Sequence, residues 1–368
     1  MTNGDARLGK ENIMLDKARL SALPSYIDTL RKTKLPIFIY GMGDGCLKLL
    51  SILNRYSIPC SGIFASDEFV RDKVFEGHRI HKLSEIEESV SEFIVLLAFG
   101  AGYPQLMDKI DGIARRHRLI IPDMPVVGDG LFTKEYMLEH FGELDKVYSL
   151  LTDDISRRTY LDIIEYKITC ELSALKSSQT EPEELYSILN LGKEEIYADL
   201  GAYTGDTIAQ FLASTGGSYK KIIAMEPNPR NFRKLSQSVE RLENVELINA
   251  AAGAADGSIT MLKGGGRMIR QVSGGKGVEI PRLKLDSVLG SEDCTYIKYD
   301  VEGAEAEAIK GSEKTILRCK PKLNVSIYHR VEDLFALPLY INSLLPEKKI
   351  YIRRAPCYPA WEISAIVV

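Results

Sequence analysis

The segment DLGAYTGDT, residues 199–207, combines acids, glycines and hydroxyl groups. It directly follows the apolar residues IYA at 196–198. Asp199 ends a predicted strand, and Gly201 and Gly205 let the backbone approach a ligand because they have no Cβ. The segment has no lysine, so it is not a triphosphate-binding loop, and its acids would repel a pyrophosphate. Glu226 ends the next predicted strand, where a carboxylate can accept both hydroxyls of a ribose. This pattern predicts a site for S-adenosylmethionine, whose amino and sulfonium groups are positive.

A competing glycine turn, YGMGDG at residues 40–45, follows the apolar run PIFI. Its spacing is G-x-G-x-G, whereas the dinucleotide fingerprint requires its third glycine at the position of Cys46. Asp67 ends the next predicted strand and could bind a ribose. We favour a tight strand-to-helix turn without a cofactor here. A nicotinamide-dependent oxidoreductase centred on residues 40–67 is the alternative.

Two acids and a histidine could activate an acceptor hydroxyl. In YIKYDVEGAEAEAIKG, Asp300 and Glu302 stand at the carboxyl end of a predicted strand, where ligands bind in parallel sheets. His329 ends the predicted strand KLNVSIY and is expected at the same edge. O-methylation needs a base that takes the hydroxyl proton as the oxygen attacks, and these three residues are the candidates. They could also hold a metal for a catechol-like acceptor, but we expect no metal site.

The segment KGGGRMIRQVSGGKG, residues 263–277, contains six glycines together with Arg267, Arg270 and Lys276. It could form a lid whose cations meet a phosphate or carboxylate of the acceptor. A hairpin tip without a ligand role accounts for the composition equally well.

The composition excludes several classes of protein. The chain has 368 residues, 45% of them apolar, with a net charge of −4 and a pI near 5.9. No basic block with interleaved aromatics appears, so we expect no nucleic-acid partner. The longest uncharged apolar run, residues 93–102, is too short to span a membrane, and the polar N-terminus does not resemble a signal peptide. Six scattered cysteines without a CxxC pair suit a reducing cytoplasm.

Strand-like and helix-like segments alternate in two parts of the chain, which predicts two parallel α/β sheets. We expect a Rossmann-like N-terminal domain over residues 1–128, a helical connector over 129–190 and a second α/β domain over 191–368. In the last of these, Asn228 and Pro229 predict the start of a helix. The final segments KIYIRR and WEISAIVV predict a terminal β-hairpin.

Several segments in the second half follow one another as in a known family. They are IYADLGAYTGDT, IIAMEPNPRNFRKL, NAAAGAADGSIT, LDSV, YIKYDVEGAEAEAIKG, NVSIYHRVEDLFALPLYI and YIRR. Over about residues 146–368 the chain resembles the FkbM family of S-adenosylmethionine-dependent methyltransferases. The resemblance implies a class I methyltransferase Rossmann-like sheet, ending in the hairpin, with the N-terminal half as an accessory domain. This chain departs from the family pattern at two places. It has Tyr203 where many members have Asn, and it lacks the histidine and the acidic pair that the family usually has after YIRR.

The resemblance also implies what the protein does. Family members typically O-methylate hydroxyls of sugars, glycans or natural products. We therefore expect a small-molecule or glycan acceptor and S-adenosylmethionine as the cofactor. The sequence leaves open whether the protein forms a homo-oligomer. A non-catalytic binding protein with the methyltransferase fold is a further alternative. The expected catalytic residues are Asp300, Glu302 and His329, and the expected cofactor-binding residues are Asp199, Gly201, Tyr203, Thr204, Gly205, Asp206, Thr207, Glu226, Asn228, Ala250, Ala251 and Asp256.

Overall fold

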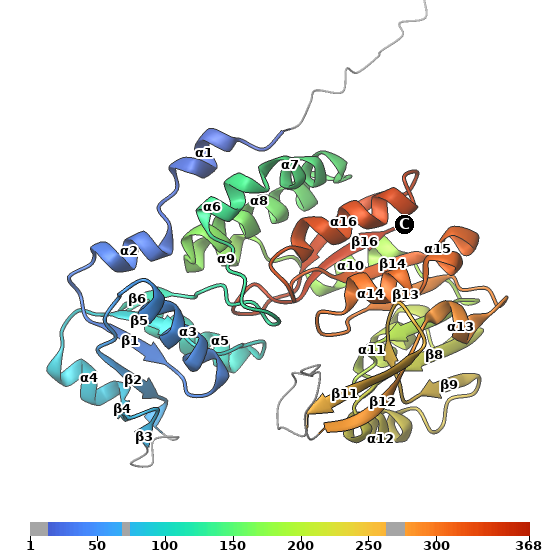
Figure 1. Cartoon of the computed structure of the whole chain (residues 1–368), viewed down its shortest axis with the longest axis horizontal. Helices are drawn as coiled ribbons and strands as arrows, with labels where there is room; N and C mark the ends of the chain where they lie inside the picture. The colour runs from blue at the N-terminus through green and yellow to red at the C-terminus, as the bar shows by residue number, and fades with distance from the viewer. Residues whose placement is uncertain (1–13, 68–73, 263–276) are drawn as a thin grey trace, which may run out of the picture.

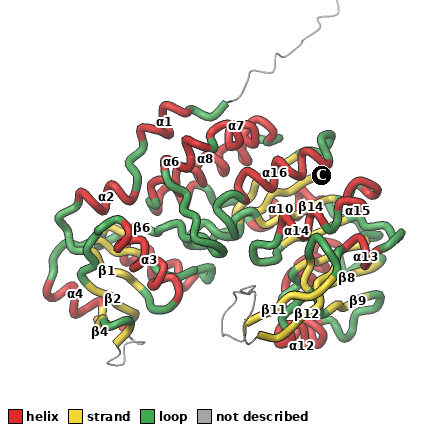
Figure 2. The backbone as a smooth tube through the Cα atoms, in the orientation of Figure 1, coloured by secondary structure: helices red, strands yellow, loops and turns green. Residues whose placement is uncertain are grey.

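The computed structural model describes residues 14–67, 74–262 and 277–368. It contains two large β-sheets, one in each half of the chain, a small third sheet, and a group of helices between the two large sheets (Figure 1). Strands and helices alternate around both sheets (Figure 2). Within the described residues, no helix is both long enough and apolar enough to cross a lipid bilayer.

The N-terminal sheet has six strands in the order β3-β4-β2-β1-β5-β6, and only the β3–β4 pair is antiparallel. The central strands β1, β2 and β5 are buried along their whole length, as expected for a parallel sheet covered on both faces. The strands are β1 (Ile37–Tyr40), β2 (Gly62–Ala65), β3 (Val74–Phe75), β4 (His78–Lys82), β5 (Ile94–Leu97) and β6 (Arg118–Ile120). The helices of this half are α1 (Lys17–Ala22), α2 (Tyr26–Lys32), α3 (Asp44–Arg55), α4 (Leu83–Ser89) and α5 (Pro104–Ala114).

Helices fill the chain between the two sheets. The longest of them, α8, packs against α9 and strand β15, and most of its side chains are buried. The helices are α6 (Lys134–Glu139), α7 (Phe141–Leu150), α8 (Asp154–Thr169), α9 (Leu172–Ser177) and α10 (Pro182–Leu189). One hydrophobic core includes side chains of both sheets and of these helices. The proposed domain boundaries at 128 and 190 stay predictions, although both fall between regular elements.

The C-terminal sheet has seven strands in the order β15-β16-β14-β13-β7-β8-β9. Strands β7, β8, β9, β13 and β14 are parallel, whereas β16 runs antiparallel to both β14 and β15. The predicted terminal hairpin is therefore confirmed. The strands are β7 (Ile196–Leu200), β8 (Lys221–Met225), β9 (Val245–Ile248), β13 (Tyr296–Tyr299), β14 (Lys322–Ser326), β15 (Ile350–Arg354) and β16 (Ile363–Val367). The helices are α11 (Asp206–Thr215), α12 (Pro229–Ser238), α13 (Leu285–Leu289), α14 (Glu305–Lys310), α15 (Glu313–Cys319) and α16 (Asp333–Leu344).

A small three-stranded sheet stands beside the C-terminal sheet, in the order β10-β12-β11. Its strands are β10 (Ala251–Ala252), β11 (Gly257–Leu262) and β12 (Gly277–Leu283). The predicted lid lies between β11 and β12, and all of it except Gly277 falls outside the described residues.

The start of α12 is as the sequence predicts. The side chain of Asn228 accepts a hydrogen bond from the backbone N–H of Arg230 at 2.9 Å, and Pro229 is the first helical residue. The sequence did not predict the β3–β4 pair, because β3 has only two residues and β4, His78–Lys82, has a single apolar residue, Ile80.

Loops of the two halves meet at the carboxyl edge of the N-terminal sheet. Ala101, after β5, and Tyr358, between β15 and β16, exchange two backbone hydrogen bonds of 2.6 and 2.8 Å. A Cβ at Gly100 would lie 2.2 Å from the ring of Trp361. The loop between β15 and β16 is therefore packed tightly against the N-terminal half (Figure 1).

Candidate active site

The candidate site lies where three neighbouring strands of the C-terminal sheet end. Strands β7, β13 and β14 are parallel, so their carboxyl ends share one edge. Asp199 lies near the end of β7, Asp300 directly follows β13, and His329 follows β14 after a short loop. The sheet thus brings together side chains that the sequence analysis assigned separately to the cofactor and to the acceptor.

Asp199 is fully buried, and one of its carboxylate oxygens has no hydrogen-bond partner. The hydroxyl of Thr207 donates a hydrogen bond of 2.5 Å to the other oxygen, Oδ2. The ammonium of Lys298 lies 3.7 Å from Oδ1, beyond hydrogen-bond distance. Burial raises the pKa of Asp199, and Lys298 and Thr207 only partly oppose this shift. A buried carboxylate with a vacant acceptor position suits a positively charged ligand group.

The glycines of the turn after β7 are required by packing. Gly201 has a φ of +88°, and a Cβ there would lie 1.8 Å from the carbonyl oxygen of Asp300. Gly205 has a φ of +91°, and a Cβ there would lie 2.4 Å from the hydroxyl of Ser238. Close packing, against backbone at Gly201 and against a side chain at Gly205, therefore explains both residues without a ligand. Their predicted role at the cofactor stays a prediction, as it does for Thr204 and for the exposed Tyr203 and Asp206 in the same turn.

Glu226, directly after β8, is buried and faces the same turn. Its Oε2 accepts a hydrogen bond of 3.0 Å from the backbone N–H of Tyr203, and its Oε1 accepts one of 2.8 Å from the N–H of Asn228. Burial raises the pKa of Glu226, although these hydrogen bonds favour its ionised form. These contacts fix the carboxylate beside the turn, which agrees with a role at the ribose but does not test it.

Three residues were predicted near the adenine. Ala250 is buried and Ala251 is half-buried, so both present small side chains after β9. Asp256 is exposed and accepts hydrogen bonds of 2.8 Å from the N–H of Lys284 and 2.7 Å from the hydroxyl of Ser287. These bonds lower the pKa of Asp256. They anchor the turn before β11, and a contact of Asp256 with adenine stays a prediction.

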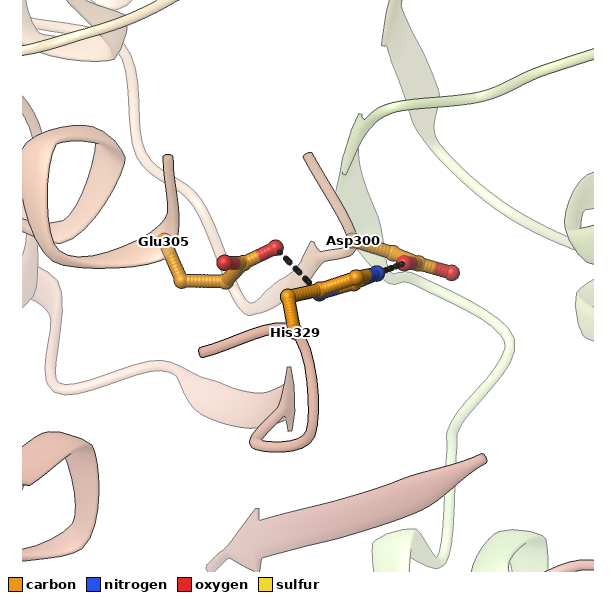
Figure 3. Close-up of side chains that lie close together, drawn as sticks. All are labelled: Asp300, Glu305 and His329. Atoms are coloured by element: carbon orange, nitrogen blue, oxygen red, sulfur yellow. Dashed lines mark ion pairs between the residues drawn. The ribbon is translucent and has the colours of Figure 1, made fainter. Parts of the chain in front are cut away.

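The imidazole of His329 is only 1% exposed and lies among three carboxylates. Figure 3 shows Asp300 and Glu305 on either side of the ring. Nε2 lies 3.6 Å from Asp300 Oδ1 and also 3.6 Å from Glu302 Oε2, and Nδ1 lies 3.0 Å from Glu305 Oε1. The structure therefore brings together all three predicted catalytic residues.

The sequence analysis missed two buried charged residues of this cluster. Glu305 begins α14 and accepts backbone hydrogen bonds from Val301 at 2.9 Å and Gly303 at 3.3 Å. Lys298 lies in β13, in register with Asp199, and its ammonium is 3.3 Å from Asp300 Oδ2. Both stand within the segment IKYDVEGAE. An ionisable residue at an otherwise apolar strand position was the signal that could have identified Lys298.

The charges of the cluster depend on one another. Burial would lower the pKa of His329, but Glu305, Asp300 and Glu302 outweigh this effect and raise it to about 9. Burial would raise the pKa of Asp300, but Lys298 and His329 outweigh it and lower the pKa. Asp300 is therefore ionised at neutral pH, and His329 holds a proton in the protein without ligands.

A segment from the N-terminal half packs directly against the loops that carry these residues. The N–H of Val127 donates a hydrogen bond of 2.9 Å to the carbonyl oxygen of His329. A Cβ at Gly303 would lie 2.9 Å from the Val127 side chain. Lys48, on α3, donates a hydrogen bond of 3.0 Å to the carbonyl oxygen of Pro125. The position of the loops that carry Gly303 and His329 thus depends on both halves of the chain.

Comparisons with known proteins agree with this geometry. Residues 199–348 match the family model of the methyltransferase FkbM domain. A methyltransferase FkbM from Methylobacillus flagellatus KT is similar in structure, with 20% sequence identity and a TM-score of 0.71 over 98% of this chain and 96% of that chain. Its likeness to this chain extends through the N-terminal half and supports the predicted fold class.

Weaker structural similarities cover about half of this chain. An rRNA methylase from Streptococcus thermophilus has 18% identity and a TM-score of 0.34, covering 51% of this chain and 95% of that chain. Fibrillarin from Aeropyrum pernix, in complex with natively bound S-adenosyl-L-methionine, has 13% identity and a TM-score of 0.31, covering 50% of this chain and 74% of that chain. No curated protein matches the sequence. The family model and the fold together confirm the resemblance seen in the sequence, and the chain carries an FkbM methyltransferase domain over residues 199–348.

Proposed function

We propose that this protein transfers a methyl group from S-adenosylmethionine to a hydroxyl of a sugar, a glycan or a natural-product metabolite. The family implies methylation that depends on S-adenosylmethionine. The observation that carries the proposal is the pairing of the vacant Asp199 oxygen with the His329 cluster on one sheet edge. A cation-binding carboxylate and a group of proton-accepting side chains are what the two reactants of this transfer require.

The residues fit this cofactor. The buried Oδ1 of Asp199 can accept a hydrogen bond from the cofactor's ammonium group, which would satisfy its vacant position. Glu226 would bind the ribose, and the turn that begins at Gly201 would surround the methionine portion. The cofactor supplies an electrophilic methyl group on a positive sulfur. Thr204, Gly205, Asp206, Thr207, Tyr203, Asn228, Ala250, Ala251 and Asp256 complete the proposed binding set.

The cluster at His329 would bind and orient the acceptor. The hydroxyl oxygen attacks the methyl carbon in line with the departing sulfur, so a C–O bond forms as the C–S bond breaks. The hydroxyl proton passes to a carboxylate of the cluster, Asp300 or Glu302. His329 lies 3.6 Å from both of them and would hold them in place. The sulfur leaves as a neutral thioether. The charge balances because the positive sulfonium is replaced by the proton that the hydroxyl releases.

No observation favours the oxidoreductase alternative at the first glycine turn. Gly41 has a φ of +118°, and a Cβ there would lie 2.5 Å from the Phe99 ring. A Cβ at Gly45 would lie 1.9 Å from the carbonyl oxygen of Ala98. Packing against the loop after β5 therefore accounts for these two glycines. All six cysteines are free thiols, which suits the reducing cytoplasm that we predict as the location.

Calorimetric titration of the whole protein with S-adenosylmethionine and S-adenosylhomocysteine tests the cofactor, with NADH as the control. We expect micromolar binding of the first two ligands, corresponding to about −8 kcal/mol, and none of NADH. A panel of sugars and hydroxylated natural products, with methyl-labelled cofactor, then tests the acceptor. Binding of NADH alone would refute the proposal. Methyl transfer to nitrogen or carbon, with none to a hydroxyl, would refute its O-methyl part.

A further inference from the structure

Oxygen and nitrogen ligand atoms converge at the acceptor end of the site. Asp300, Glu305 and His329 each contribute one such atom, and these three atoms lie within 4.8 Å of one another. They come from three separate places, since Asp300 follows β13, Glu305 begins α14 and His329 follows β14 (Figure 3). The fold of the sheet edge therefore assembles the cluster.

The spacing of these atoms is close to that of a metal site. A divalent cation lies about 2.0–2.2 Å from carboxylate or imidazole ligands, so two of its ligands are at most about 4.4 Å apart. The 4.8 Å within which the three atoms lie is slightly longer than this distance. Asp300 offers Oδ1 for this purpose, because Lys298 contacts the other oxygen, Oδ2, at 3.3 Å.

Two buried atoms of the cluster have no hydrogen bond, and this observation is independent of the spacing. Oε2 of Glu305 makes none, and Nδ1 of His329 has only its ion pair with Glu305 Oε1 at 3.0 Å. Both side chains are 1% exposed. Buried polar atoms are rarely left without a partner, because each loses its hydration on folding. A ligand between these groups would satisfy them.

The charge of the cluster points to a cation. The carboxylates of Asp300, Glu302 and Glu305 surround one imidazole, and Lys298 is the nearby ammonium described above. Carboxylates suit Mg²⁺, Ca²⁺ and Mn²⁺, whereas imidazole suits first-row transition metals, so the mixed set favours a first-row divalent ion. We propose that Asp300, Glu305 and His329 bind such an ion, represented by Mn²⁺. The sequence analysis considered Asp300, Glu302 and His329 as a possible metal site and expected no metal there, and it did not recognise Glu305.

A bound ion would act on the acceptor, and this consequence rests on the function proposed above. It would lie at the carboxyl ends of β13 and β14, beside the place assigned to the acceptor hydroxyl. A divalent cation lowers the pKa of an oxygen that it contacts. The ion would thereby favour loss of the hydroxyl proton during attack on the methyl group.

Titration of the full-length protein with Mn²⁺, after treatment with EDTA and dialysis, tests the proposal without any cofactor or acceptor. We expect electron paramagnetic resonance to show one bound Mn²⁺, and pulsed measurements to show coupling to an imidazole nitrogen. Glu305→Gln, which keeps the shape of the side chain, should weaken binding by about tenfold or more. Glu307→Gln changes an exposed acid on the same helix and should leave the affinity unchanged.

The wild-type measurement tests the proposal even if a variant does not fold. Absence of bound Mn²⁺, or bound Mn²⁺ without nitrogen coupling, would overturn the proposal. Equal affinities of Glu305→Gln and Glu307→Gln would overturn it as well. Titration with S-adenosylmethionine in the presence of EDTA measures cofactor binding without the metal. Failure of the metal site is therefore distinguishable from failure of the proposed function.

Discussion

The two glycine turns occupy the same place in two similar sheets but have different surroundings. Each follows a central parallel strand, β1 or β7. Each of these strands is the first of its sheet's parallel strands along the chain, and later strands lie on both sides of it. The turn after β1 is packed against Phe99 and the Ala98 carbonyl. The turn after β7 lies beside Asp199, Glu226 and Asp300.

This contrast shows what distinguishes a chemical site from a structural turn. Glycines are needed at both places because neighbouring backbone or side chains approach too closely for a Cβ. Buried ionisable groups, in contrast, cost free energy unless they are paired or bind something. Of the two turns, only the one after β7 has such groups gathered beside it. The buried charges, rather than the glycine pattern, favour the second turn as the candidate site.

The largest effect is expected for Gly201→Ala. A methyl group there would overlap the Asp300 carbonyl oxygen, and the positive φ adds backbone strain. We expect the free energy of unfolding to fall by about 3 kcal/mol or more, as measured by urea denaturation. Gly216→Ala is the matched control, since it has a φ of +64° but open space around it, and should lose only the strain. Equal losses in the two variants would show that the contact with Asp300 is unimportant.

Asp199→Asn should weaken the binding of S-adenosylmethionine by about 100-fold. The substitution keeps the shape but removes the charge that faces the ammonium group, and a charge-assisted hydrogen bond is worth about 1.5–3 kcal/mol. Calorimetric titration measures the change. Asp44→Asn, at the first residue of the helix that follows the first glycine turn, should have no effect on cofactor binding. An unchanged affinity of Asp199→Asn would move the cofactor site away from β7.

Cofactor binding and protein stability should depend on pH in opposite directions. Burial raises the pKa of Asp199 and Glu226 above their values in the unfolded chain, which are near 4. The folded protein therefore binds more protons, and this contribution to stability decreases as the pH rises from about 4 through the raised pKa values. Binding of the positive cofactor requires the ionised carboxylates, so its affinity increases over the same range.

The pH prediction is tested by calorimetric titrations and urea denaturation between about pH 5 and pH 8. Asp199→Asn should show a weaker dependence in both measurements, because one of the two titrating groups is gone. A wild-type affinity that is constant over this range would show that neither carboxylate titrates there.

The smallest effect is expected for Gly43→Ala in the first turn. Gly43 has a φ of +121° but no atom within 4 Å of its added Cβ, so about 1–2 kcal/mol of backbone strain is the only cost. The affinity for S-adenosylmethionine should change by less than about twofold, which corresponds to less than about 0.4 kcal/mol of binding free energy. A large loss of cofactor affinity would mean that the first turn contributes to the active site after all.

Local patterns in the sequence predicted much of the fold. The apolar runs of β1, β2 and β5, the cap at Asn228 and the terminal hairpin all appear where expected. These features depend on residues close together in the chain, through strand periodicity and hydrogen bonds to the nearest turn. The β3–β4 pair was missed because a two-residue strand and a strand with one apolar residue carry no such pattern.

The sequence by itself determined the family, the two α/β halves and which acids and histidine belong at strand ends, because these follow from ordered motifs and local periodicity. Only the tertiary structure decided that Glu305 and Lys298 join His329 and Asp300, and that Val127 supports the loop of His329. The physical reason is that burial and distance between segments far apart in the chain arise from packing of whole elements. The same packing determines the pKa values of the cluster, since desolvation and neighbouring charges exist only in the folded protein.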